Sequence, residues 1–294
     1  MAVSRLAPGV EIVDVAGLGL AVRTPDGEFL RVDTGGVAAK DLLARLEGGP
    51  EGSQELESLV RAFEDAGYAG CAGSPAGQAL AGRAVLVLGD EPLAGDFARR
   101  VAAEGADVTR LCPADVDALA EQATHGPEGM PTVVVWCLDS PATPGLWDAA
   151  DTLPAKGVGW LRCHREGFQA WLEPLAAGPG DVTSADVRLR RLAVSPAHRE
   201  LAAYWEGRRT AESGAPGTAA SAALIAELLT ADLLAWADGR LRTGRLPVRR
   251  RLRRVDLRDL SVSEHPVLPV PRVAPLPPPR THRAAGISSG GTSR

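Results

Sequence analysis

An uninterrupted apolar run at residues 84–88 most constrains the fold of this chain. Such a run is typical of a strand in a parallel sheet that is covered on both faces. Gly89 and a short loop follow, and the next segment carries Phe97 and Val101 at helical spacing. A turn then leads to a second apolar segment at 108–111. This order predicts the opening β-α-β unit of a Rossmann-like sheet in an α/β domain.

The loop after the first strand lacks the features that bind a nucleotide. In dinucleotide-binding proteins it reads G-x-G-x-x-G, so that backbone can approach the pyrophosphate. Here Gly89 is followed by Asp90 and Glu91, whose carboxylates repel a phosphate. Pro92 comes next and has no N–H to donate. We therefore expect a degenerate Rossmann-like domain that does not bind nucleotide in the usual way.

The α/β pattern continues to residue 272, which predicts one domain over 83–272. Further elements are expected as helices at 116–123 and 146–153 and as strands at 132–138, 159–163 and 168–175. A helical segment at 184–205 is interrupted near Pro196, and we expect its His198 at the surface. The segment 218–238 is apolar nearly all round, which indicates a helix buried in the core or in a homodimer interface.

Residues 1–70 are expected to form a smaller domain, joined to the rest by a Gly/Ala-rich linker at 71–82. Three β-rich segments separated by turns are expected as strands at 10–15, 18–23 and 28–33. Two helices follow, and Ser53 is the expected N-cap of the second. The apolar residues of that helix recur at i, i+3, i+4 and i+7 and are Leu56, Leu59, Val60 and Phe63. This order of elements predicts a winged-helix-like domain.

Winged helices often bind DNA, but the charge of this domain opposes that use. Up to residue 70 the chain has six basic and twelve acidic residues. The second expected helix alone carries four carboxylates that would face phosphates unfavourably, namely Glu55, Glu57, Glu64 and Asp65. Peptide binding is the more natural use, with an extended segment added to the edge of the sheet.

The composition favours a cytoplasmic protein that has neither nucleic acid nor a membrane as partner. The net charge is −5, the first residues lack a secretory signal, and no apolar run reaches the length of a membrane span. No C-x-x-C pair occurs, so we expect no zinc site and interpret the cysteines as isolated buried thiols. The cysteines are Cys71, Cys112, Cys137 and Cys163.

An arginine-rich stretch and a biased tail end the chain. Nine arginines lie from Arg240 to Arg258, with no aromatic residues among them of the kind that stack on nucleic-acid bases. Alternating apolar residues there suggest strands with solvated outer faces. A nucleic-acid patch and a contact with an acidic partner both remain open for this stretch. From 273 to 294 the chain is rich in Pro, Gly and Ser, and we expect it to be extended or disordered.

With these segments placed, the chain resembles the ocin-ThiF-like, leader-peptide-binding proteins of azole-forming (TOMM) peptide pathways. PGVEIVDVAGLGLAVRTPDGEFLRVDTGG and the helices after it look like a RiPP recognition element. The α/β part is similar to a degenerate ThiF-like adenylating domain. WLEPLAAGPGDVTSADVRLRRLA and HPVLPVPRVAP resemble the two segments that bear the family's zinc cysteines, but neither contains cysteine. The glycine loop is also lost, so the resemblance implies no cofactor.

The resemblance implies a peptide site in the N-terminal domain, where the family's leader adds as a strand between the third strand and a neighbouring helix. The implied site residues are Phe29, Leu30, Arg31, Val32, Asp33, Leu56, Leu59, Val60, Arg61 and Phe63. Because side chains alternate along a strand, only every second one faces the groove, and the sequence leaves open which set does. Arg31 and Arg61 are expected to contact carboxylates of the leader.

The function implied by the resemblance is that of a non-catalytic adaptor. It would bind the leader of a ribosomal precursor and present the core peptide to a YcaO-type cyclodehydratase, which uses ATP to form azolines from Cys, Ser or Thr. The residue spacing indicates no Ser–His–Asp group, metal cluster or carboxylate pair, so no catalytic residue is expected. Two alternatives stay open, namely a divergent adenylating enzyme and a winged-helix DNA-binding regulator.

Overall fold

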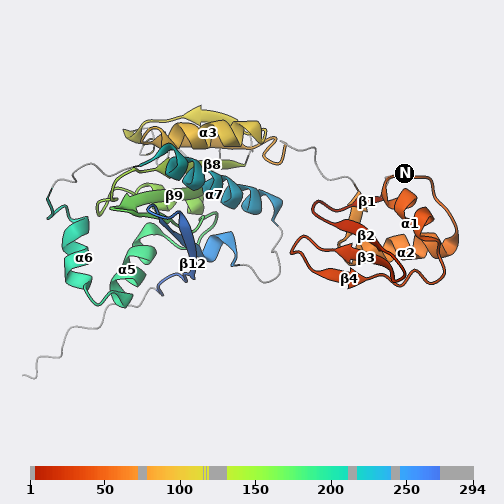
Figure 1. The fold of residues 1–294 in the computed structure, drawn as a ribbon. Helices are drawn as coiled ribbons and strands as arrows, with labels where there is room; N and C mark the ends of the chain where they lie inside the picture. The colour runs from red at the N-terminus through yellow and green to blue at the C-terminus, as the bar shows by residue number, and fades with distance from the viewer. Residues whose placement is uncertain are drawn as a thin grey trace, which may run out of the picture.

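The computed structural model describes residues 4–71, 78–114, 116, 118, 131–210, 217–239 and 246–271. Within these ranges the chain forms two bodies, each with its own hydrophobic core (Figure 1). The second body begins before the expected boundary at Arg83, because Leu80 is fully buried in its core. Most of the expected linker, at 72–77, and the tail from 273 lie outside the described residues.

The N-terminal body combines an antiparallel sheet with two helices (Figure 1). Its elements in chain order are β1 (Ser4–Leu6), β2 (Glu11–Val15), β3 (Gly19–Arg23), β4 (Phe29–Arg31), α1 (Ala39–Leu46), α2 (Gln54–Asp65) and β5 (Ala69–Cys71). The sheet order β2-β3-β4 confirms the three predicted strands, although the third is shorter than expected. Ser53 accepts a hydrogen bond from the N–H of Leu56 and caps α2, as expected. The pairing of β1 with β5 was not predicted and joins the two ends of this body.

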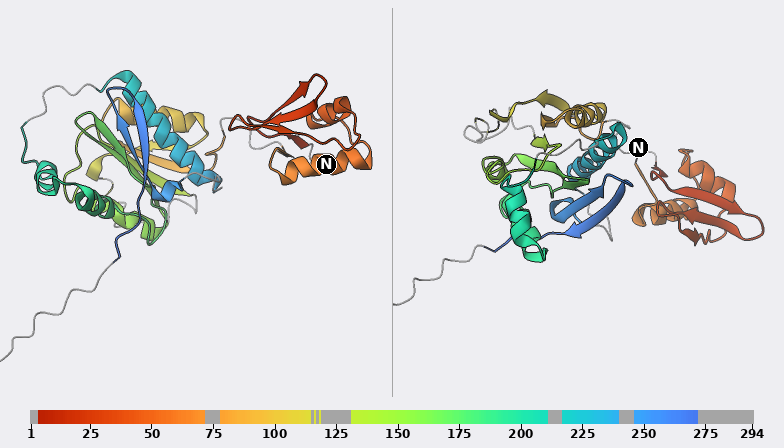
Figure 2. Two further views of the ribbon diagram at one scale, coloured as in Figure 1. Left: turned by 60° about the horizontal axis from the view of Figure 1, so that its bottom comes forward. Right: turned by 60° about the vertical axis from the view of Figure 1, so that its left-hand side comes forward.

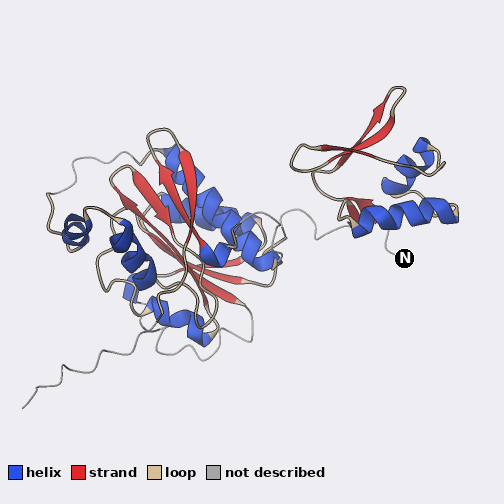
Figure 3. Ribbon diagram, turned by 90° about the horizontal axis from the view of Figure 1, so that it is seen from below, coloured by secondary structure: helices blue, strands red, loops and turns tan. Residues whose placement is uncertain are grey.

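The second body contains a mixed sheet of seven strands in the order β12-β11-β10-β9-β8-β6-β7 (Figure 3). The strands are β6 (Ala84–Gly89), β7 (Asp107–Arg110), β8 (Thr132–Cys137), β9 (Gly159–Glu166), β10 (Gln169–Leu172), β11 (Arg251–Asp256) and β12 (Ser261–Pro266). Four neighbouring strands, β7, β6, β8 and β9, are parallel, in agreement with the expected Rossmann-like unit. The other three are antiparallel and extend the sheet beyond β9.

Side chains from helices and loops cover both faces of this sheet, which explains the continuous apolar sequences of β6 and β8. The helices are α3 (Leu93–Ala103), η2 (Ala150–Lys156), α5 (Ser184–Val194), α6 (His198–Trp205), α7 (Ala219–Asp238) and η3 (Val248–Arg250). α3 packs against α7, while α5 and α6 lie on the opposite side of the domain from α3 (Figures 1 and 2). The break between α5 and α6 confirms the interruption expected near Pro196, and His198 is exposed.

The prediction of one helix in this body is wrong, and a second predicted helix lies mostly outside the described residues. The segment 146–153 forms turns and the start of the 3₁₀-helix η2 rather than an α-helix. Pro154 explains the difference, because proline removes an N–H donor and disfavours the α conformation at the residue before it. Of the helix expected at 116–123, residues 116 and 118 are helical, and the rest lies outside the described residues.

α7 is buried along one face, which confirms in part the buried helix that its apolar sequence predicts. By length and composition it is also apolar enough to cross a membrane, which corrects the expectation that no apolar run reaches that length. Its contacts are those of a core helix, because Leu229 and Leu233 are fully buried and the helix packs against α3. Its Asp232 carboxylate forms ion pairs with Arg251 and Arg253 of β11. These contacts account for its apolar sequence, and the homodimer stays a prediction.

Gly89 joins β6 to the loop before α3, and its backbone requires glycine. Its φ of 128° strains any residue with a side chain, and an added Cβ would lie 1.8 Å from the carbonyl oxygen of Cys137. We expect Gly89→Ala to destabilise the α/β domain by at least ~2 kcal/mol and to lower its Tm by about 4 °C or more in scanning calorimetry. In the control Gly70→Ala the added Cβ meets no atom within 4 Å. An unchanged Tm for Gly89→Ala would contradict this requirement.

Candidate functional site

β4 is an edge strand of the N-terminal sheet, and one set of its backbone groups is unpaired within that sheet. Val32, just beyond β4, donates its N–H to the carbonyl of Leu20 over 2.9 Å. Hydrogen-bonded and non-hydrogen-bonded pairs alternate along antiparallel strands, so Leu30 also directs its backbone groups at β3. Phe29 and Arg31 therefore direct their N–H and carbonyl groups outward, toward the free edge.

The strand register assigns the side chains of β4 to two faces. Leu30 is paired with Val22 of β3, which is buried in the core, so Leu30 lies on the core side of the sheet. Val32 packs against the same core. Phe29 and Arg31 lie on the opposite, solvent-facing side. Phe29 is 62% exposed and Leu30 40%, so both faces of this strand offer accessible apolar surface.

α2 contributes mostly core side chains to this region. Leu56, Val60 and Phe63 are buried in the hydrophobic core of the N-terminal body. Leu59 is partly buried at the border of that core. Arg61 is exposed, and its Nε donates to a main-chain carbonyl one turn earlier over 3.4 Å. Of the helix residues that the resemblance implies, Leu59 and Arg61 are therefore the accessible ones.

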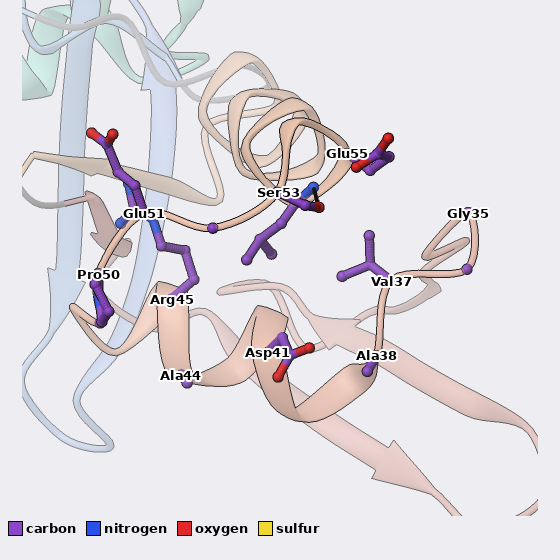
Figure 4. Close-up of a pocket in the computed structure, with 14 residues that line it drawn as sticks. Gly35, Val37, Ala38, Asp41, Ala44, Arg45, Pro50, Glu51, Ser53 and Glu55 are labelled. Atoms are coloured by element: carbon purple, nitrogen blue, oxygen red, sulfur yellow. Dashed lines mark hydrogen bonds between the residues drawn. The ribbon is translucent and has the colours of Figure 1, made fainter.

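A pocket of about 640 Å³ opens between the loop after β4 and the start of α2 (Figure 4). Its wall carries the carboxylates of Asp41, Glu51 and Glu55. Arg45 also lines it and forms a bidentate ion pair with Glu57. Asp41 and Glu55 lie in the first turns of α1 and α2, where negative charge stabilises a helix N-terminus. Leu56 is the one member of the implied peptide site that lines this pocket.

In the α/β domain, the loop after β6 places a carboxylate at the N-terminus of α3. Glu91 accepts a hydrogen bond from the N–H of Gly95 over 3.1 Å and another from Arg110 over 2.7 Å. Free N–H groups at such a helix start are the groups that bind phosphate in nucleotide-binding relatives of this fold. A Cβ at Gly95 would lie 2.4 Å from the Glu91 carboxylate, so glycine is needed for this contact. The carboxylate thus lies where a phosphate would bind.

The two segments that resemble the family's cysteine-bearing segments lie side by side. The carboxylate of Asp186 in α5 accepts a hydrogen bond from the N–H of Val270 over 3.0 Å. Arg190 donates to the carbonyls of Leu268 and Pro269 over 3.2 and 3.1 Å. Hydrogen bonds between protein groups therefore join these segments. Across the described ranges, no group of three or more His, Cys, Asp or Glu side chains is placed to hold a metal ion.

The cysteines correct one expectation. Cys137 and Cys163 are buried, but they are directly opposite each other on β8 and β9 and so are not isolated. A hydrogen bond with Cys137 and burial raise the pKa of the Cys163 thiol. Cys112 is exposed, because it follows the edge strand β7 and not a buried strand.

The arginine-rich stretch is bound largely by the domain itself. Its six arginines after residue 248 all have side-chain partners, namely Asp181 for Arg249 and Arg250, Asp232 for Arg251 and Arg253, Gln169 for Arg254, and Asp256 for Arg258. Residues 240–245 lie outside the described part of the chain. Guanidinium groups that already pair within the domain are poorly available to phosphates, so the described part of this stretch does not favour nucleic-acid binding.

A row of charged residues on β9 was missed from the sequence. Arg162, His164 and Glu166 share one face of the strand because side chains alternate. Arg162 is fully buried and donates to Glu173 over 2.7 Å. His164 Nε2 lies 3.2 Å from the Glu166 carboxylate. The available signal was Arg162, a charged residue between the apolar Leu161 and Cys163 of the expected strand.

Glu166 joins this row to α5 and α6. Its carboxylate accepts hydrogen bonds from Arg191 over 2.9 and 2.6 Å and from the indole of Trp205 over 2.5 Å. Burial by itself raises the pKa of Glu166, but the hydrogen bonds from His164 and Arg191 and the charge of Arg191 outweigh it. The pKa consequently lies well below its usual range. The ionised carboxylate therefore stabilises the folded state at neutral pH.

We expect Glu166→Gln to lower the free energy of unfolding by about 2–3 kcal/mol at neutral pH, because Arg191 loses its buried charge partner. A carboxylate with a lowered pKa contributes its full stability above the unfolded value of about 4.3 and loses it as the pH falls below. The difference between variant and wild type should therefore shrink on acidification, as urea unfolding at several pH values can measure. The control Glu227→Gln removes an exposed carboxylate paired with Arg100 and should change little. A pH-independent difference would contradict the role of ionised Glu166.

No protein-family model and no curated protein match the chain, but solved structures share its fold. The heterocyclase TruD matches with a TM-score of 0.60 and 11% identity over 90% of this chain and 41% of TruD. MccB from E. coli matches with TM-scores of 0.54 with ATP and 0.57 with MccA, at 10% identity over 92% of this chain and 98% of MccB. A heterocyclase in complex with substrate and cofactor matches at 0.50 and 11% identity, over 92% of this chain and 39% of that one. This chain spans less than half the length of the two heterocyclases, and the likeness at these identities is one of fold.

Proposed function

We propose that this chain is a non-catalytic adaptor that binds the leader of a ribosomally made precursor peptide. It presents the precursor to a YcaO-type, ATP-dependent cyclodehydratase that forms azolines in a thiopeptide or another azole-containing peptide. The observation that carries the proposal is the open edge of β4. There, Phe29 and Arg31 direct backbone groups outward, beside the accessible side chain of Leu30.

The edge strand β12 of the large sheet carries features that oppose strand addition, and β4 lacks them. Open edges invite pairing with other chains, and folded proteins usually block them. In the large sheet, Val267 donates its N–H to Arg250, so the neighbouring Pro266 of β12 faces outward and has no N–H to offer. Leu260, with a positive φ, bends the chain just before β12. β4 is short, but it has neither of these two features, so its outward backbone groups are open to an extended peptide.

The shared fold supports the pathway class. Two of the matched structures are heterocyclases, namely TruD and the one that was solved in complex with substrate and cofactor. The YcaO-type partner and the leader come from the family resemblance of the sequence. In the proposal, the N-terminal body recognises the leader and the α/β domain is the scaffold that contacts the partner.

An adenylating enzyme is the second candidate, because MccB shares the fold in a structure with ATP. The loop after β6 opposes this candidate. The Glu91 carboxylate lies at the N-terminus of α3, and Pro92 lacks an N–H. For the third candidate, a DNA-binding regulator, the acidic N-terminal body and the paired arginines of β11 are both unfavourable.

We expect titration calorimetry of the purified chain to show no ATP binding up to about millimolar nucleotide. The reason is that Glu91 accepts the hydrogen bond of Gly95 that a phosphate would need, and it repels the phosphate by charge. A micromolar Kd would favour the adenylating enzyme over the adaptor. Salt-dependent binding of duplex DNA, measured in parallel, would favour the regulator.

We expect Arg31→Pro to weaken leader binding at least tenfold relative to Arg31→Ala. Both variants lack the guanidinium, but only the proline variant loses the outward N–H, and β3–β4 pairing does not use that group. A lost backbone hydrogen bond with its unsatisfied partner is worth about 1–3 kcal/mol, and ~1.4 kcal/mol is tenfold. Fluorescence polarisation with a labelled precursor leader peptide measures the affinities. Equal affinities in two folded variants would move the peptide away from this edge.

A further inference from the structure

We infer that the solvent-facing side of β4 reads every second residue of the bound peptide through Phe29 and Arg31. This inference rests on the proposed function, because it needs a peptide strand beside β4. It names a peptide class. A carboxylate residue lies opposite Arg31, an aromatic or aliphatic residue lies opposite Phe29, and one apolar residue stands between the two on the core side.

Arg31 is an unpaired cation in an acidic body. Among the described residues it forms no hydrogen bond or ion pair through its side chain. Arg23 and Arg45 of the same body, by contrast, have carboxylate partners at 3.3 and 2.9 Å. Among the described residues Arg5 and Lys40 likewise form no side-chain hydrogen bond or ion pair, but only Arg31 lies on the open strand edge. A guanidinium that stays free beside an outward N–H is suited to a carboxylate from another chain.

Phe29 supplies apolar surface on the same side. It is 62% exposed, more than Phe168, the other exposed phenylalanine, at 44%. Its cross-strand neighbour on β3 is Arg23, whose guanidinium is already paired with Glu11. A strand added on the open side would place a side chain directly opposite Phe29. Aromatic–aromatic and aromatic–aliphatic pairs of this kind stabilise a sheet.

The spacing follows from the backbone. The outward N–H and carbonyl groups belong to Phe29 and Arg31, so these two residues form the hydrogen-bonded pairs with an added antiparallel strand. The peptide residues opposite them are two positions apart and share one face. The residue between them faces the core side, next to Leu30 and close to the sheet edge. The side chains of the peptide therefore contact both faces of the sheet edge. The ionic contact, with Arg31, lies on the solvent-facing side.

The test is selection of peptides from a display library of random 12-residue sequences on the immobilised full-length chain. We expect enriched peptides to carry Asp or Glu two residues from an aromatic or aliphatic residue, with an apolar residue between. On Arg31→Glu as bait, the acidic position should change to Lys or Arg. Lys40→Glu makes the same charge change on α1, outside the proposed site, and should leave the consensus unchanged.

One enriched peptide then tests the contact directly by fluorescence polarisation. Arg31→Glu should weaken its binding at least tenfold, and replacing the peptide's acidic residue by Lys should restore it. If the Arg31→Glu bait selects the same acidic consensus position as the wild type, the proposed contact between Arg31 and a peptide carboxylate is overturned. If the wild type enriches no peptide at all, the peptide-binding function itself is contradicted, so the two failures are distinct.

Discussion

Buried guanidinium–carboxylate pairs hold the antiparallel half of the large sheet and the helices around it. Arg162 and Glu173 are buried together, and Asp232 of α7 pairs with Arg251 and Arg253 of β11. Asp232 is almost completely buried, and this burial raises its pKa against the opposing effect of its two arginines. Removing one member of such a pair leaves a buried charge without compensation. The positions of α7 and β11 therefore depend on complete sets of partners.

The two bodies differ in how their charged side chains are paired. In the α/β domain, charged side chains pair with one another, and four of the six described arginines of the C-terminal stretch are bound to the sheet or to α7. In the N-terminal body, the sheet has an open edge, and Arg31 and Phe29 project from it into solvent. This difference underlies the roles proposed above, recognition for the small body and support for the large one.

The sequence predicted what depends on local pattern. Continuous apolar runs identified β6 and β8, and the capping residue Ser53 identified the start of α2. It did not predict the β1–β5 pairing, which joins segments more than sixty residues apart, or the charged row on β9, whose partners come from α5 and α6. The candidate peptide site was predicted as a set of residues. Only the register of β4 on β3 could separate the solvent-facing Phe29 and Arg31 from Leu30 on the core side. Leu56, Val60 and Phe63 of the implied site lie in the core.

The Glu91 contact also restricts how this loop can change. Replacing Glu91 by glycine would clear the N-terminus of α3 but would leave Arg110 without its carboxylate, and Pro92 would still offer no N–H. Replacing Pro92 alone would leave the carboxylate in place. The Glu91 carboxylate and the missing N–H of Pro92 are therefore two separate features that distinguish this loop from one that could hold a phosphate. A phosphate could bind at the start of α3 in the usual way only after the loop had lost both features.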